Sequence, residues 1–200
     1  MKVSRTLLTA LLLSACASNT SAGPDATEKL LAEVPDTWVK VIERNTGQLA
    51  VSEYIPPDTG QDWTEKLIIE ALSGSDLPDP LVFVQGLAQE QGEVCNDFTE
   101  SGVFAGFENG YPTAVHMMQC PENKRTKNAM LTMVKVIRGN NAFYTVTRIW
   151  RLPPVTEDED GVKSVPVGST EIGAWSQALR QIQVCDPALS AHACPPQDER

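Results

Sequence analysis

The chain has 200 residues and a formal net charge of -10 at pH 7, with 42% hydrophobic and 21% charged residues. These values are typical of one globular domain with a sizeable core rather than of a disordered chain. The negative charge disfavours nucleic-acid binding, because contact with a phosphate backbone needs a basic surface. No apolar run reaches the ~20 residues of a membrane-spanning helix.

The first 15 residues have the layout of a secretory signal. Lys2 and Arg5 form a positive segment, and the apolar segment that follows, Thr6 to Leu13, is too short to span a bilayer. The next residues, LSAC, resemble the bacterial lipobox, in which an aliphatic and two small residues precede a cysteine. The resemblance implies cleavage before Cys16 and acylation of Cys16. Several acyl chains on one residue would anchor the mature chain stably in a membrane.

An ordinary signal peptidase is the alternative reading of this segment. Ala15-Cys16-Ala17 and Thr20-Ser21-Ala22 both supply small residues for its cleavage, which would release a soluble protein. The cysteine count favours the lipid anchor. Acylation of Cys16 uses one of five cysteines and leaves an even number for an oxidising compartment. Ala17 follows the anchor, and by analogy with Gram-negative sorting this favours the outer membrane, with the domain facing the periplasm.

These signals divide the chain into four segments. We expect residues 1–15 to be the signal peptide and residues 16–25, which are small and polar, to be a flexible tether. Residues 26–194 are expected to form a single domain. Residues 195–200 are expected to be a loose C-terminal tail.

The domain is expected to begin with a helix and a hairpin. Residues 26–34 predict a short helix that ends before Pro35. Asn45-Thr46-Gly47 separates two strand-like runs, residues 38–43 and 48–55, which predicts a β-hairpin. The segment DWTEKLIIEAL that follows a proline-rich turn predicts another strand.

A longer helix is expected from Asp79-Pro80, which pairs an N-cap residue with proline at the first helical position. Gly92 is the expected end of this helix. Leu81, Val84, Leu87 and Ala88 share one face of this helix.

The second half of the domain is dominated by extended segments. Residues 99–120 are expected to be extended, and two β-rich runs around Gly139-Asn140-Asn141 predict a long hairpin. An acidic loop then leads to a last helix, capped by Ser169 or Thr170 and ending before Pro187. The expected buried face of that helix comprises Ile172, Trp175, Leu179 and Ile182.

The order of elements predicts an α+β fold, an antiparallel sheet with flanking helices, because the strands do not alternate with helices. The motifs SEYIPPDTGQDWTEKLIIEAL and VIRGNNAFYTVTRIWR resemble those of uncharacterised proteobacterial envelope lipoproteins. The element order also resembles the PsbP-like fold, over about residues 38–185. This resemblance implies an accessory or binding protein, and it carries over no catalytic residue.

Four cysteines remain besides Cys16, and four cysteines allow three pairings. We expect Cys95–Cys120 and Cys185–Cys194, because this pairing closes the shortest loops. Each bridge is expected to stabilise the fold by about 3 kcal/mol. The alternative is that these cysteines form a zinc or redox site. The sequence has no C-x-x-C motif and only two histidines, so neither a metal nor another cofactor is expected.

No catalytic motif is found in the sequence. His116 is expected to be structural or solvated, on the same strand face as Cys120. The acidic run Glu157 to Gly161 lacks the spacing of a calcium loop, and the basic residues from Lys124 to Lys127 are interpreted as surface charge.

Two aromatic residues beside turns are the best candidates for a partner-binding surface. Trp63 follows a proline-rich turn, and Tyr111 follows Asn109-Gly110. The interpretation is a non-enzymatic binding or accessory module, held to the membrane by its N-terminal lipid, with an envelope protein as partner. An envelope hydrolase, with His116 near a hydroxyl and a carboxylate, and an inhibitory lipoprotein are the alternatives.

Overall fold

The computed structural model describes residues 27–155, 157, 161 and 163–196. The predicted signal peptide, the tether and Cys16 lie outside these residues, as do most of the acidic loop and the last four residues. No helix in the described part of the chain is long and apolar enough to cross a membrane.

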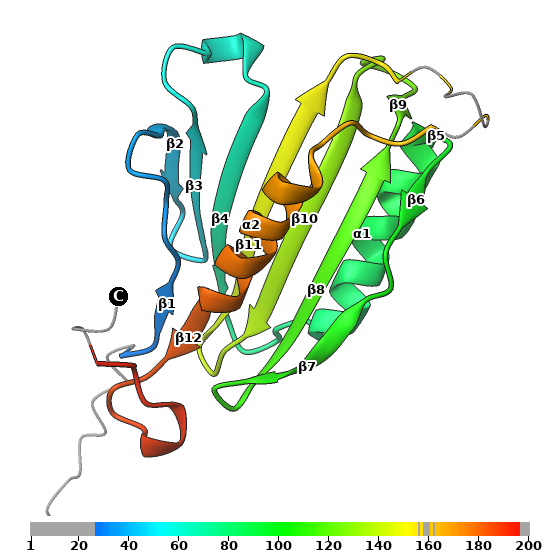
Figure 1. The fold of residues 1–200 in the computed structure, drawn as a ribbon. Helices are drawn as coiled ribbons and strands as arrows, with labels where there is room; N and C mark the ends of the chain where they lie inside the picture. Colours follow the sequence, from blue (N-terminus) through cyan, green and yellow to red (C-terminus); the bar gives the residue numbers. More distant parts are fainter. Residues whose placement is uncertain (1–26, 156, 158–160, 162, 197–200) are drawn as a thin grey trace, which may run out of the picture.

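The centre of the fold is an eight-stranded antiparallel sheet, which confirms the predicted α+β class (Figure 1). Along the sheet the order is β2-β3-β4-β11-β10-β8-β6, and β7 pairs with β8 on the same edge as β6. The strands are β2 (Val39–Asn45), β3 (Leu49–Ile55), β4 (Glu65–Ser73), β6 (Thr99–Glu100), β7 (Phe104–Glu108), β8 (Tyr111–Cys120), β10 (Ala129–Arg138) and β11 (Ala142–Leu152).

Shorter elements complete the domain. Two small strand pairs lie outside the main sheet: β1 (Lys29–Leu31) with β12 (Gln183–Cys185), and β5 (Cys95–Asn96) with β9 (Glu122–Asn123). The helices are α1 (Pro80–Val94) and α2 (Ser169–Gln181), with 3-10 turns η1 (Gly60–Asp62) and η2 (Ser190–His192).

The two helices lie on opposite faces of the sheet (Figure 1). On the α2 face, Trp175 and Leu179 of the helix belong to the same buried cluster as Leu131 and Trp150 of the sheet. On the other face, Val84 and Ala88 of α1 pack with Met118 of β8 and neighbours in β10 and β11. Two buried layers thus sandwich the central strands, and β8 and β10 alternate between them along their length.

The local signals for hairpins and for α1 are confirmed. β2–β3 and β10–β11 are antiparallel hairpins at the predicted places. The Asp79 carboxylate caps α1 by accepting hydrogen bonds from the backbone N–H groups of Leu81 and Val82. Gly92 does not end α1, which continues to Val94. Gly92 instead lies against the ring of Phe98.

The predicted helix at residues 26–34 is wrong, because this segment contains strand β1. β1 pairs with β12, about 150 residues later, so its hydrogen bonds come from a distant segment that local periodicity does not reveal. Cys185, expected at the end of the last helix, lies in β12. The N-cap of α2 is Gly168, which offers no capping side chain.

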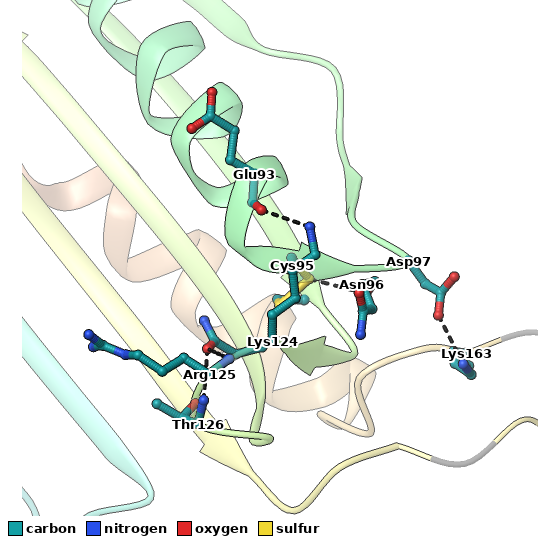
Figure 2. The surroundings of a disulfide bond; sticks show 10 residues. Glu93, Cys95, Asn96, Asp97, Lys124, Arg125, Thr126 and Lys163 are labelled. Atoms are coloured by element: carbon teal, nitrogen blue, oxygen red, sulfur yellow. Dashed lines mark hydrogen bonds and ion pairs between the residues drawn. A yellow bond between two sulfur atoms is a disulfide. The ribbon is translucent and has the colours of Figure 1, made fainter.

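Both predicted disulfides are confirmed. Cys185 and Cys194 join β12 to the C-terminal loop, with Cα atoms 4.8 Å apart. Cys95 and Cys120, with Cα atoms 5.6 Å apart, tie the end of α1 to the end of β8. Figure 2 shows that this second bridge lies beside Lys124, whose Nζ donates to the Glu93 carbonyl at 2.7 Å.

Candidate functional site

One half of the sheet is covered on the α2 face only. Residues directly opposite each other in the register share a face, so the positions on the α1 side of β2, β3, β4 and β11 can be read from the pairings. α1 packs on β8 and β10, at the other side of the sheet (Figure 1). The resulting open face carries Ile42, Arg44, Leu49, Val51, Glu53, Lys66, Ile68, Glu70, Leu72, Thr145, Thr147, Ile149 and Arg151.

The open face mixes apolar and charged side chains: Ile68 lies between Glu53 and Thr147 in the register, with Lys66 and Glu70 on either side of it along β4. Val51, Ile68 and Ile149 are half-buried, and α1 packs mainly on β8 and β10 and reaches this half of the sheet at Phe143 of β11. Lys66 Nζ lies 2.5 Å from Glu53 Oε2, which neutralises both charges across two strands. The Thr145 hydroxyl donates to Glu70 at 2.7 Å. Protein-binding surfaces combine apolar side chains with paired polar ones in this way.

Trp63 lies at the end of the open face nearest to η1, which is the cyan turn at the top of Figure 1. Its ring is flanked by two cations, Lys66 Nζ at 4.6 Å and the Arg151 guanidinium at 4.3 Å from the ring centroid. Cations over an indole ring are attracted by its electron-rich face. The position of Arg151 is fixed further, because it donates to the Gln61 carbonyl at 2.9 Å. Trp63 is therefore a half-exposed aromatic side chain held between two cations, of which Lys66 is paired with Glu53 and Arg151 is hydrogen-bonded to Gln61.

The prediction that Tyr111 is a surface anchor is wrong. Tyr111 is only 2% exposed and belongs to the core. The ring of His192 stacks on it with centroids 4.2 Å apart, and His192 Nδ1 lies 2.8 Å from the Asn109 carbonyl oxygen. The Cys185–Cys194 bridge holds the C-terminal loop in this position. Burial, together with the nearby carboxylates Glu28 and Asp186, raises the pKa of Tyr111 to about 12.

His116 is buried and faces the α1 side, as its predicted parity with Cys120 requires. Its Nε2 lies 3.0 Å from Glu100 Oε2 and 3.1 Å from the Ser101 carbonyl oxygen. The Ser101 hydroxyl is engaged elsewhere, donating to the Gly102 carbonyl and accepting from the Met117 N–H. A hydrolytic base needs the nucleophile on one ring nitrogen and the carboxylate on the other. In this structure Glu100 and the Ser101 carbonyl both contact His116 Nε2. His116, Glu100 and Ser101 therefore lie together without forming a catalytic triad.

Arg148 is a polar core residue that sequence reasoning missed. Its guanidinium lies 4.7 to 5.2 Å from the ring centroids of Trp38, Trp150 and Trp175 and is ion-paired with Glu65. Arg148 lies on the same α2 face of β11 as Val146 and Trp150, two residues away on either side. This period-two pattern is the sequence signal that could have predicted its burial. Three indole rings and a carboxylate close to the guanidinium compensate its charge, so we assign Arg148 a structural role.

No group of three or more metal-ligating side chains occurs among the residues that the structure describes. The basic residues between Glu122 and Asn128 form a tight turn in which the Asn123 side chain accepts from the Arg125 and Thr126 N–H groups (Figure 2). Lys127 in this turn is ion-paired with Glu122 at 2.8 Å.

No protein-family model matches the chain, and no curated protein sequence matches it. Several solved structures are similar in fold. LpqN of Mycobacterium tuberculosis, described as involved in cell envelope biogenesis, shares 17% identity at a TM-score of 0.42, over 78% of this chain and 82% of LpqN. The Saccharomyces cerevisiae Ran-binding protein Mog1p shares 15% identity at a TM-score of 0.47, over 80% of this chain and 97% of Mog1p.

A protein of unknown function from Pseudomonas aeruginosa, PA94, shares 12% identity at a TM-score of 0.40, over 76% of this chain and 94% of that one. At these identities and TM-scores the similarities say nothing about a partner or an activity of this chain. The resemblance to proteobacterial lipoproteins stays an expectation, because no sequence match supports it.

Proposed function

We propose that this chain is a lipid-anchored envelope protein that binds a protein partner through the open face of its sheet. The observation that carries the proposal is Trp63, held half-exposed between Lys66 and Arg151 at the end of a sheet face that carries half-buried apolar side chains. Tryptophan and arginine are the residue types most often found as energetic anchors of protein interfaces. The lipobox-like LSAC segment and the cysteine count support attachment through Cys16.

The charges around Trp63 indicate the chemistry of the partner. Lys66 is already paired with Glu53, whereas Arg151 has no carboxylate partner among the residues that the structure describes. The chain as a whole has a net charge of -10, so this cationic spot differs from the average surface. We therefore propose a partner that places an acidic side chain over Arg151 and apolar side chains over the middle of the open face.

The proposed location is the outer membrane, with the domain in the periplasm. Ala17 after the acylated cysteine supports the outer membrane by analogy with Gram-negative sorting. The two disulfides suit an oxidising compartment of this kind. Non-enzymatic binding is proposed because His116 is committed to Glu100 and the Ser101 carbonyl rather than to a hydroxyl nucleophile.

The anchor predicts that Cys16→Ala abolishes incorporation of labelled fatty acid into the chain, because the acylated thiol is then absent. Metabolic labelling and gel mobility in the host cell measure this, and Ser14→Ala, which keeps a small residue in the same segment, is the control. Equal labelling of the Cys16→Ala chain and the unaltered chain would show that the lipid is not at Cys16.

The interface predicts that Trp63→Ala weakens partner binding by at least about 2 kcal/mol, roughly thirtyfold in Kd, because a central aromatic anchor is removed. A photo-crosslinking residue at Ile68, in the middle of the open face, is used in intact cells to capture the partner for identification by mass spectrometry. The binding measurement is then made with both purified proteins. The control is Val82→Ala on α1, which truncates a side chain of 65% exposure away from the open face.

Trp63 is half-buried, so its truncation is expected to lower the free energy of unfolding by less than the roughly 3–5 kcal/mol of a fully buried tryptophan. Should Trp63→Ala unfold the chain, Arg151→Met tests the same contact, because it removes the cation and keeps the apolar stem. Unchanged affinity of folded Trp63→Ala and Arg151→Met chains would contradict the proposed surface.

A further inference from the structure

Strand β7 carries two phenylalanines that the fold leaves in solvent. Phe104 is 78% exposed and Phe107 is 76% exposed, and they are the most exposed large apolar side chains of the described residues. β7 pairs with β8 along one edge only. Its sequence is FAGFE, and its single acidic residue, Glu108, is ion-paired with buried Lys135. The strand thus presents an uncharged apolar edge, which is unusual on a domain with a net charge of -10.

The described chain begins at the same end of the molecule as the β7–β8 turn. The Thr27 hydroxyl donates to Asp186 Oδ1 at 2.5 Å, and the Asp186 N–H donates to the His192 carbonyl at 2.7 Å. His192 Nδ1 in turn lies 2.8 Å from the carbonyl oxygen of Asn109, the residue after β7. Figure 1 shows β1, β12 and β7 together at the bottom of the molecule, opposite to η1.

Ten residues separate Cys16 from Thr27. Ten residues span at most about 35 Å when fully extended, and about 17 Å on average as a flexible coil. An acylated Cys16 therefore keeps Thr27, and with it the β7–β8 turn, within reach of the lipid headgroups.

We propose that Phe104 and Phe107 form a second contact with the membrane, in which the β7 edge enters the headgroup region of a bilayer. This inference rests on the lipid anchor of the proposed function. A phenylalanine buried in lipid strengthens a membrane association by roughly tenfold or more. The ion pair of Glu108 with Lys135 removes the repulsion that a free carboxylate would meet at an anionic surface.

An apolar hollow beside β7 extends this surface. Its volume is about 330 Å³, and it is lined on the α2 side of the sheet by Phe104, Val115, Met133 and Leu179, with Glu108, Ser176 and Arg180 also on its wall. The contact would direct the bottom of the domain to the membrane and leave Trp63, beside η1 at the opposite end, facing away from it (Figure 1).

The test uses the full chain, matured with its lipid and reconstituted in phosphatidylethanolamine and phosphatidylglycerol vesicles with acyl chains brominated near the headgroup. Phe104→Trp and Phe107→Trp are each expected to lose emission to the bromine relative to the unaltered chain. Val94→Trp is the matched control, because Val94 is 49% exposed and adjoins β5 at the opposite end of the sheet. It is expected to show no added quenching.

A second measurement removes the acyl anchor. In the full-length Cys16→Ser chain, Phe107→Ser is expected to lower partition into the same vesicles by about tenfold. Protein that floats with the vesicles while both introduced tryptophans stay unquenched would overturn the membrane contact and leave the proposed function intact.

Protein that fails to float would overturn the lipid anchor itself and this inference with it. Equal quenching of Val94→Trp would overturn the orientation. A dimer of the Cys16→Ser chain in solution that Phe107→Ser dissociates would assign the edge to a second copy instead of the membrane.

Discussion

Glu28→Ala is expected to lower the free energy of unfolding by about 3 kcal/mol, although Glu28 precedes the first strand of the fold. Glu28 is only 7% exposed, and its carboxylate accepts hydrogen bonds from the N–H groups of Asn140 at 2.7 Å and Asn141 at 3.3 Å. It also accepts from the Tyr144 hydroxyl at 3.1 Å. Truncation leaves the buried Tyr144 hydroxyl without its acceptor and removes two further, part-buried hydrogen bonds. A buried donor left unpaired costs about 1–3 kcal/mol, and each other lost hydrogen bond costs about 1 kcal/mol.

The carboxylate also fills the space above the β10–β11 turn. A Cβ atom at Gly139 would contact the Glu28 side chain, which explains why the turn carries glycine there. Burial, with Glu28 nearby, raises the pKa of Tyr144, so its hydroxyl stays protonated and remains a donor at neutral pH.

Chemical denaturation of the purified chain measures the effect. Glu33→Ala is the control, because Glu33 lies five residues later and is exposed, and a change within about 0.5 kcal/mol is expected. Glu28→Gln keeps one acceptor oxygen and is expected to lose less than Glu28→Ala. A loss below about 1 kcal/mol for Glu28→Ala would mean that the segment before β1 is not part of the cooperative domain.

The elements that could be predicted from the sequence are those whose signals are local. The β10–β11 hairpin follows from two β-branched and aromatic runs around Gly139-Asn140-Asn141, and α1 follows from its Asp79-Pro80 start. β1 could not be predicted, because Leu30 and Leu31 fit a helix face as well as a strand. Only the pairing with β12 decides between the two.

The candidate site shows the same division. The exposure of Trp63 follows from turn residues that precede it directly. The burial of Tyr111 depends in part on the loop around His192, about 80 residues later, which a disulfide holds over it. The open face also depends on which strands lie side by side, since β4 pairs with β11 across the intervening α1 and β8. This order of strands in the sheet cannot be predicted from a local sequence pattern.

Lys135 is a buried charged residue whose burial the sequence pattern indicates clearly, although we did not predict it from the sequence. It stands in the run MVKVI, where the parity of Met133 and Ile137 places it on the buried α2 face. It is 1% exposed, and its Nζ donates to the Leu179 carbonyl at 2.7 Å and is ion-paired with Glu108. Burial lowers the pKa of Lys135, and the Glu108 carboxylate opposes that shift.

Glu108→Gln is therefore expected to destabilise the fold by about 2–3 kcal/mol at pH 7, because it leaves a buried ammonium without its counter-charge. The value is set below the usual cost of breaking a fully buried pair, because the Glu108 side chain is 38% exposed. Lys135→Met, which removes the charge and keeps the volume, is expected to change stability by less than about 1 kcal/mol.

The pH dependence distinguishes a buried charge from lost packing. Because the pKa of Lys135 is lowered in the fold from its ordinary 10.5, the unfolded chain binds more protons than the folded chain between the two pKa values. Stability is therefore expected to rise with pH through that window. Glu108→Gln lowers the folded pKa further, so its window begins at lower pH and its deficit shrinks as the solution becomes alkaline.

Urea denaturation of the single variants and of the Glu108→Gln, Lys135→Met double variant, from pH 6 to 10, measures both effects. The double variant is expected to be more stable than Glu108→Gln alone at pH 7, because no charge is then left buried, and to lose the alkaline rise that Lys135 causes. A Glu108→Gln deficit that stays constant over this pH range and persists in the double variant would show that Glu108 contributes packing rather than charge compensation.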